Sequence, residues 1–247
     1  RNSNLTFPDK KVIVNLAPAD LKKEGTNFDL PIAVGIQLEE EVIPPEKVKD
    51  YAFIGELSLD GSLRGINGVF PLVLGLRDFG VKNVIVPKQN AKEAGLVEGI
   101  NVYGAEFLSD VIAHFTENPL SPTVVDVKAY LARSNEDDYL YDFKEVKGQQ
   151  KAKRALEIAA AGGHNMLMVG SPGSGKTMMA KCFPSILPPL ELSEALELTK
   201  IYSICGLLHS DEPLMSKRPF RPVHHTASPY GIIGGGSSPK PGEITLA

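Results

Sequence analysis

The chain has 247 residues, with 26 Lys or Arg against 30 Asp or Glu, which gives a formal net charge of −4. This charge argues against a protein that coats nucleic acid by bulk electrostatics, although a local basic patch could still bind nucleic acid. Its two cysteines have no metal-site or disulfide spacing, and no apolar run of about 18 residues occurs, so we expect a cytoplasmic protein without membrane association. The length favours two domains, and the start at Arg1 instead of Met suggests a fragment.

The first half of the chain has the pattern of a mixed α/β unit. Its expected elements are a strand at 12–18, a helix at 29–38, a β-hairpin with arms at 52–59 and 62–66, a helix at 69–79, a strand at 83–87, a helix at 91–96, a strand at 100–103 and a helix at 108–116. Asp29 is placed to cap the first helix. Asp60 and Gly61 predict the hairpin, because glycine accepts the positive φ of a tight turn.

A Pro-, Ser- and acid-rich stretch then separates this unit from the second half. We therefore expect a first domain at 1–118, a linker at 119–142 and a second domain at 143–247. The expected elements of the second domain are a helix at 149–161, a buried strand at 165–169, a helix from 177 to near 184 and a helix at 190–207. Residues 216–226 and 231–243 are rich in Gly and Pro and lack regular periodicity, which indicates functional loops.

The residues between the expected strand at 165–169 and the following helix fit the phosphate-binding loop pattern G-x-x-x-x-G-K-[ST]. The loop consists of Gly170, Ser171, Pro172, Gly173, Ser174, Gly175, Lys176 and Thr177. Its glycines let the backbone curl and aim N–H groups at a β-phosphate, while Lys176 reaches the β- and γ-phosphates and the Thr177 hydroxyl is placed to ligate Mg²⁺. The pattern predicts binding of ATP with Mg²⁺, with Lys176 and Thr177 as the catalytic pair.

The order of motifs closely resembles the magnesium-chelatase-like AAA+ ATPases of the YifB/ComM family over almost the whole chain. The motifs of the second half are VKGQ at 146–149, GHNMLMVGSPGSGKT at 163–177, RPFRPVHH at 218–225 and GGGSSPKPGEITLA at 234–247. Those of the first half are VNLAPAD at 14–20, FDLPIA at 28–33 and GELSLDGSLRG at 55–65. The resemblance implies an α/β fold: a Lon-protease-like (S5-type) α+β domain followed by an incomplete P-loop AAA+ α/β domain.

The first domain departs from the Lon pattern at both catalytic positions. Lon-type peptidases pair a Ser nucleophile with a Lys base. Superposing their motif on residues 29–35 places Ile32 at the nucleophile, and counting back from 87–90 places Phe70 at the base. Neither side chain can attack a carbonyl or transfer a proton, so we expect a peptidase fold without activity, used for docking or oligomerisation.

The resemblance also implies what the intact protein does. Such proteins are ring-forming ATPases, expected here as a homo-hexamer that remodels DNA or acts as a branch-migration helicase, as suggested for the competence-related branch. The family's Walker B strand, sensors and arginine finger are expected after Ala247, so this chain should bind ATP or ADP and hydrolyse ATP poorly. Alternative functions are an ATP-dependent Lon-like peptidase or protein remodeller and a magnesium chelatase subunit, although chelatase motor subunits normally lack a Lon-like front domain.

Other candidate residues keep two interpretations. Val146, Gly148 and Gln149 occupy the place where AAA+ proteins pack against adenine, or simply begin a helix. The basic residues between 217 and 225 suit phosphate contact and base stacking, or a solvated or subunit-contacting loop. The candidates in this run are Lys217, Arg218, Phe220, Arg221, His224 and His225. The glycines at 234–236 could approach DNA or a neighbouring subunit or be a flexible loop, and Cys182 and Cys205 are interpreted as core residues.

Overall fold

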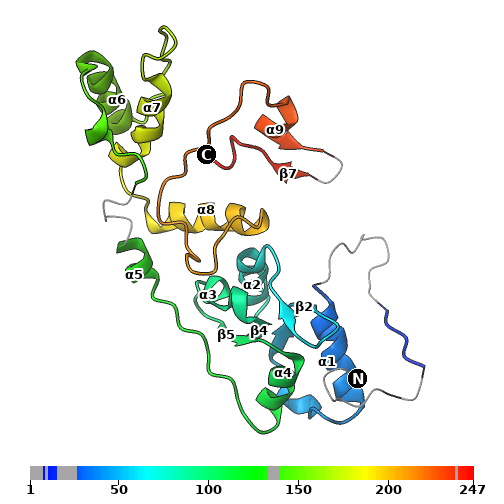
Figure 1. The fold of residues 1–247 in the computed structure, drawn as a ribbon. Coiled ribbons are helices and arrows are strands. Elements are labelled where there is room, and N and C mark those ends of the chain that lie inside the picture. The colour runs from blue at the N-terminus through cyan, green and yellow to red at the C-terminus, as the bar shows by residue number, and fades with distance from the viewer. Residues whose placement is uncertain (1–7, 9–10, 16–26, 133–138, 237–238) are drawn as a thin grey trace. The chain divides into compact units, whose positions relative to one another are not determined.

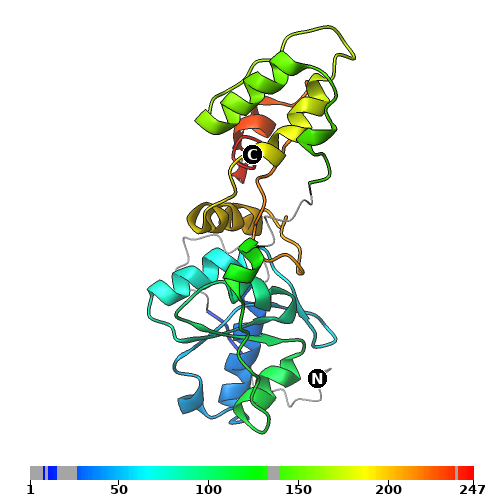
Figure 2. The same ribbon diagram turned by 90° about the vertical axis from the view of Figure 1, so that its left-hand side faces the viewer.

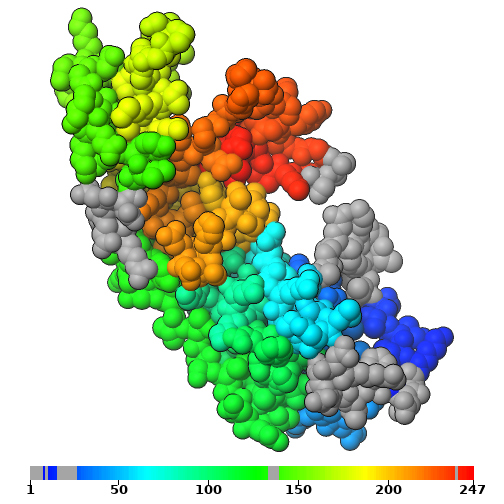
Figure 3. All heavy atoms as spheres, viewed as in Figure 1, coloured from blue at the N-terminus to red at the C-terminus, as the bar shows by residue number. Residues whose placement is uncertain are grey.

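The computed structural model describes the chain except residues 1–7, 9–10, 16–26, 133–138 and 237–238, and Figures 1 to 3 follow it from blue at the N-terminus to red at the C-terminus. Two compact units are present. The first comprises Arg1–Asp126 with Tyr202–Pro213, and the second Val127–Ile201 with Leu214–Ala247. The expected domain limits at 118 and 142 stay a prediction, but residues 202–213, which we assigned to the second domain, group with the first unit.

The first unit is built on a three-stranded parallel sheet with helices on both faces. Its strands lie in the order β1 (Tyr51–Phe53), β4 (Asn83–Pro87) and β5 (Asn101–Ala105). The helices are α1 (Asp29–Glu39), α2 (Val69–Asp78), α3 (Ala91–Ala94) and α4 (Leu108–Phe115). Val84, Ile85 and Val86 are fully buried, as expected for the central strand of a sheet covered on both sides. Ile85 packs with α1 and α4, whereas α2 and α3 lie on the other side (Figures 1 and 2).

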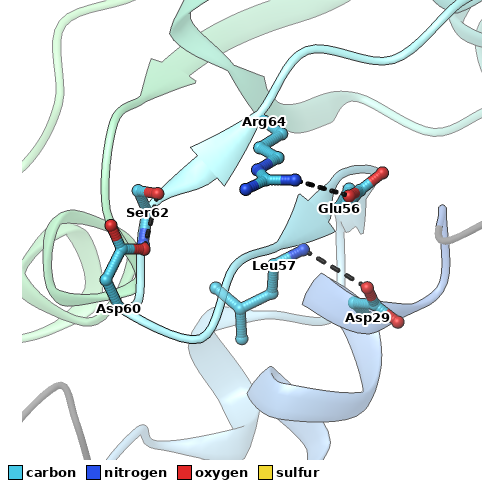
Figure 4. Close-up of polar contacts among 6 residues, drawn as sticks. All are labelled: Asp29, Glu56, Leu57, Asp60, Ser62 and Arg64. Atoms are coloured by element: carbon cyan, nitrogen blue, oxygen red, sulfur yellow. Dashed lines mark hydrogen bonds and ion pairs between the residues drawn. The ribbon is translucent and has the colours of Figure 1, made fainter.

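The predicted hairpin forms, with shorter arms and a longer turn than expected. It consists of β2 (Glu56–Leu57) and β3 (Leu63–Arg64), paired antiparallel (Figure 4). Residues 52 and 53 of the predicted first arm belong instead to β1 of the parallel sheet. Ser58 N–H donates to the Ser62 carbonyl at 2.9 Å, so the loop holds three residues. Gly61 in this loop has φ of 86°, which glycine accepts without strain. The Ser62 backbone N–H, donating to Asp60, lowers the pKa of that carboxyl.

Two expectations for the first unit are wrong. Asp29 does not cap α1, because the N-cap residue is Phe28; the Asp29 carboxylate instead accepts the Leu57 N–H at 3.4 Å and ties the helix to the hairpin (Figure 4). Residues 12–15 form no strand, and 16–18 lie outside the described residues. A strand gains its hydrogen bonds from a neighbouring strand, and none of the described strands pairs with residues 12–15.

A buried polar network attaches residues 202–213 to the first unit. The Glu93 side chain is 8% exposed, and its Oε1 accepts the Phe70 N–H at 3.0 Å and the Ser203 hydroxyl at 2.5 Å. Its Oε2 accepts the Asn90 side-chain amide at 3.2 Å. Gly68 N–H also donates to the Ser203 carbonyl at 2.9 Å. The Glu93 carboxylate therefore accepts hydrogen bonds both from the first turn of α2 and from Ser203 at the end of α8 (Leu192–Ile204).

A second buried group, His114 of α4, has a tautomer that its partners define. The Leu120 backbone N–H donates to Nδ1 at 2.9 Å, so Nδ1 carries no proton and Nε2–H donates to the Tyr51 hydroxyl at 3.0 Å. Burial lowers the pKa of His114 and raises the pKa of Tyr51 to about 12. Both side chains are thus held neutral among packed aromatic rings.

This arrangement predicts an acid-sensitive first unit. Because the pKa of His114 is lower in the folded state, its contribution to stability is full above the unfolded pKa of about 6.5 and is lost as the pH falls below that value. His114→Asn keeps an acceptor for Leu120 but does not titrate. We expect the stability gap between wild type and His114→Asn, measured by urea denaturation with circular dichroism, to shrink between pH 7.5 and pH 5. A gap that is independent of pH would contradict the assignment.

The second unit consists mainly of helices. They are α5 (Val127–Ala132), α6 (Gln150–Gly162), α7 (Lys176–Cys182), most of α8 and α9 (Pro229–Ile233). Helix α6 ends at Gly163, with φ of 62°, as the glycine pair predicts. Glycine- and proline-rich residues expected to be irregular also include a short antiparallel pair, β6 (Gly234–Gly235) with β7 (Lys240–Pro241).

The buried strand predicted at 165–169 is absent. These residues have no regular secondary structure and no strand pairing, and Leu167 and Val169 are each 88% exposed. The apolar sequence alone does not bury a strand, because its backbone groups require a neighbouring strand and none of the described strands of this unit lies beside it. Within the described parts of the chain, no helix is long and apolar enough to span a membrane.

Candidate functional site

The candidate site is the loop of residues 170–177, which connects the segment at 165–169 to α7. Gly173 and Gly175 have φ of 78° and 85°, in the left-handed region, and a Cβ at either position would meet no atom within 4 Å. The glycines are therefore required by backbone conformation, not by lack of space. Gly175 is the N-cap of α7, so Lys176 and Thr177 form its first turn.

Lys176 lies within the curl of this loop. Its Nζ donates to the carbonyl oxygens of Gly170 at 2.9 Å and Ser171 at 2.7 Å, and to the Ser174 hydroxyl at 3.2 Å. These are three donors and three acceptors, so the ammonium is fully hydrogen-bonded by the loop. A polyphosphate has to replace these neutral acceptors with charged oxygens, which form stronger hydrogen bonds. The Thr177 side chain is exposed and can reach a metal ion carried by such a ligand.

The segment at 146–149 reaches the loop through Gln149, which lies in the predicted adenine-contacting segment. Gln149 Nε2 donates to the Ser174 carbonyl at 3.4 Å, and Gln149 itself has φ of 51° beside Gly148 at 68°. Gly148 is exposed, whereas Val146 is only 5% exposed in the core below the loop. Contact of Val146 and Gly148 with adenine stays a prediction.

A small apolar core supports the loop from below. Cys182 of α7 is fully buried against α6, together with Phe143, Val146, Leu156 and Met179. Burial, followed by the nearby Glu145 and Asp142, raises the pKa of the Cys182 thiol, which therefore stays neutral and unreactive. The interpretation of Cys182 as a core residue is confirmed, whereas Cys205 is half-buried.

The basic run after residue 216 contains two arginines that are already paired. Arg218 donates to Glu194 Oε2 at 3.0 Å and to the Pro188 carbonyl at 2.7 Å. Arg221 donates to both Glu243 oxygens, at 2.6 and 2.9 Å. Both arginines therefore organise the unit itself. Phosphate contact by this run stays a prediction.

The sequence analysis did not name Tyr230 as a candidate contact residue, and the structure leaves its side chain 73% exposed. A lone aromatic residue after Pro229 in a glycine-rich segment was the signal that could have found it.

The positions that correspond to the Lon catalytic pair hold a half-buried Ile32 on α1 and a buried Phe70 in the first turn of α2. Among the described residues, no group of three His, Cys, Asp or Glu side chains could hold a metal ion.

Comparisons with known proteins agree with this arrangement. Residues 142–247 match the family profile described as magnesium chelatase, subunit ChlI, and residues 1–90 match the profile of subunit ChlI of Mg-chelatase. The competence protein ComM of Haemophilus influenzae is 42% identical over 248 residues, which cover 100% of this chain and 48% of that protein. The uncharacterized protein YifB of Salmonella typhimurium is 42% identical over 253 residues, covering 100% of this chain and 47% of that protein.

The phosphate-binding loop and these matches define the class as a magnesium-chelatase-like ATPase. Within that class, the chain belongs to the YifB/ComM family. It spans about half the length of the curated relatives that it matches. Part of the chain is also similar to Lon protease 2 of Bacillus subtilis, at 29% identity over 121 residues that cover 48% of this chain and 21% of that protein.

Proposed function

We propose that residues 170–177 bind the triphosphate of ATP and that the protein containing this chain is an ATP-driven motor that remodels DNA. The observation that carries the nucleotide site is the Lys176 ammonium, held inside the loop by three oxygen acceptors. Phosphate oxygens can take the places of these acceptors. The positive-φ glycines at 173 and 175 leave the loop open to a bulky anion, because nothing lies within 4 Å of either Cβ position.

Each residue of the loop has a role in this proposal. Backbone N–H groups of the loop contact the β-phosphate, Lys176 contacts the β- and γ-phosphates, and Thr177 contributes a ligand to Mg²⁺. When bound, Mg²⁺ neutralises charge on the phosphate oxygens. Gly148 and Val146 limit the space for the base, with Gln149 holding their segment to the loop.

DNA as the substrate and a homo-hexameric ring are further proposals for the whole protein. They are supported by the competence protein ComM, which matches along the full length of this chain. The concentration of basic residues near the end of the chain also favours a polyanionic partner.

We also propose a cytoplasmic location. Both cysteines are free thiols, which supports a reducing compartment.

A second candidate is the motor subunit of a magnesium chelatase, which is favoured by the descriptions of both matching profiles. The similarity to a competence protein along the full length of this chain favours DNA as the substrate. A Lon-like peptidase has less support, because Ile32 and the buried Phe70 stand where its Ser and Lys are expected.

Calorimetry tests the nucleotide site directly. We expect the full-length protein, shown to be folded by circular dichroism, to release or absorb heat on titration with ATP or ADP in the presence of Mg²⁺ and to saturate at one nucleotide per chain. A folded sample that gives no heat with either nucleotide would contradict the proposed function.

A further inference from the structure

The segment after Ser228 folds into a compact element that only glycine permits. We call residues 228–236 and 239–246 the glycine knob. A Cβ on Gly242 would lie 2.3 Å from the Gly234 nitrogen and 2.4 Å from the Ile232 oxygen. A Cβ on Gly234, which has φ of 95°, would lie 2.6 Å from the Lys240 oxygen. Backbone segments therefore touch directly, and Ile244 N–H donates to Ile232 at 3.1 Å.

An ion pair holds the glycine knob in place. Arg221 binds both carboxylate oxygens of Glu243, and this guanidinium holds the pKa of Glu243 below its ordinary value. The Glu243 N–H donates to the Gly231 carbonyl at 3.0 Å, and the Ser228 hydroxyl caps α9 by accepting the Gly231 N–H at 3.1 Å. The bidentate geometry fixes orientation as well as distance. The glycine knob is thus a preorganised element despite its glycine content.

This fixed element leaves large apolar side chains in water. Tyr230, Ile233 and Ile244 are 73%, 70% and 65% exposed, and Figure 3 shows the segment in orange and red at the surface of its unit. Gathered apolar side chains on a fixed scaffold are typical of an interaction site.

A cationic side chain lies at the same end as the aromatic one. The Tyr230 ring edge is 3.7 Å from the Cβ position of Gly235, and Gly235 is paired with Lys240 across β6 and β7. Lys240 is exposed, and no acidic side chain of the described residues pairs with it. An accessible ring and an exposed ammonium therefore both flank Gly235. They match the alternation of base and phosphate along a nucleic-acid strand.

The composition around the glycine knob favours a polyanionic partner, although Arg218 and Arg221 are paired with Glu194 and Glu243. Residues 214–247 contain four Lys or Arg and one acidic residue, although the chain as a whole is acidic. His224 and His225, with ring centroids 4.2 Å apart, add two further rings that can stack on bases. A duplex hides the faces of its bases, whereas a single strand exposes them to an aromatic ring.

We propose that the glycine knob contacts single-stranded DNA, with Tyr230 stacked on a base and Lys240 paired with an adjacent phosphate. This inference rests on DNA as the substrate of the proposed function. Tyr230 and Lys240 hold the strand in this proposal, and Arg221 and the glycines keep these two residues in position.

The test is fluorescence anisotropy of labelled oligo(dT) with the full-length protein at several salt concentrations. Tyr230→Ala should weaken binding about 10-fold and Tyr230→Phe should bind like wild type, because stacking needs the ring and not the hydroxyl. Lys240→Ala should reduce the slope of log affinity against log salt by roughly 0.7, the value for one phosphate contact on a single strand. Phe79→Ala is the matched control, since Phe79 is 91% exposed in the first unit, and should change nothing.

The outcomes separate this inference from the proposed function. Weaker oligo(dT) binding by Tyr230→Ala, together with wild-type binding by Tyr230→Phe, supports the contact. Wild-type affinity in both alanine variants overturns it while leaving DNA binding intact. If the wild-type protein binds no DNA, the proposed substrate fails and the contact fails with it. If Tyr230→Ala instead lowers the assembled mass in ultracentrifugation and leaves DNA affinity unchanged, the surface is a subunit contact and the inference is wrong.

Discussion

Lys176→Ala is expected to lower the affinity of the protein for ATP with Mg²⁺ by about 100-fold. The ammonium makes three hydrogen bonds within the loop, and bound phosphates offer it stronger, charged acceptors in their place. Two hydrogen bonds to charged groups are worth about 1.5–3 kcal/mol each, and part of this is offset by the loop contacts given up. A net loss of about 2.8 kcal/mol corresponds to 100-fold.

Titration calorimetry of the full-length protein measures this change, and the same variant should lack ATPase activity. Lys151→Ala is the matched control, because Lys151 is an exposed lysine on the neighbouring helix α6 and should leave affinity unchanged. Circular dichroism must show both variants folded. Wild-type affinity in Lys176→Ala would mean that the loop does not hold the phosphates.

Glu93→Ala is expected to lower the free energy of unfolding of the first unit by about 4 kcal/mol, because three buried donors lose their acceptor at about 1–3 kcal/mol each. The donors are the Phe70 N–H, the Ser203 hydroxyl and the Asn90 amide. Since typical domains are stable by only about 5–15 kcal/mol, this is a large share of the total. The attachment of residues 202–213 should loosen first, because Ser203 is their contact to the carboxylate.

Urea denaturation and hydrogen exchange of the α2 amides measure the two effects. Glu98→Ala removes an exposed carboxylate from the same region and should change stability by less than about 0.5 kcal/mol. Glu93→Gln keeps one oxygen acceptor and should lie between wild type and Glu93→Ala. If Glu93→Ala behaves like the Glu98→Ala control, the network contributes nothing to the attachment.

Elements with strong local signals were predicted well. The helices at 29–38 and 69–79 and the strand at 83–87 appear within one or two residues of their expected ends. Helical periodicity and glycine stops act within a few residues of sequence, so they can be recognised without the tertiary structure. The phosphate-binding loop was likewise defined by its own residue types and spacing, and its glycine conformations follow from that sequence.

Strand formation and polar partners could not be predicted in the same way. The apolar runs at 12–18 and 165–169 have the composition of strands, but strands depend on backbone partners that are distant in sequence. The carboxylate of Asp29 bonds to residue 57, and that of Glu93 bonds to residue 203, so neither partner was visible locally.

The sequence by itself determined the family, the loop pattern of residues 170–177 and most helices, because each is encoded by residues close together in the chain. Only the tertiary structure decided that residues 202–213 group with the first unit, that Arg221 and Glu243 fix the glycine knob, and that Tyr230 and Lys240 both flank Gly235. The physical reason is that a buried polar group or a close glycine contact depends on whichever distant segment the fold brings to it.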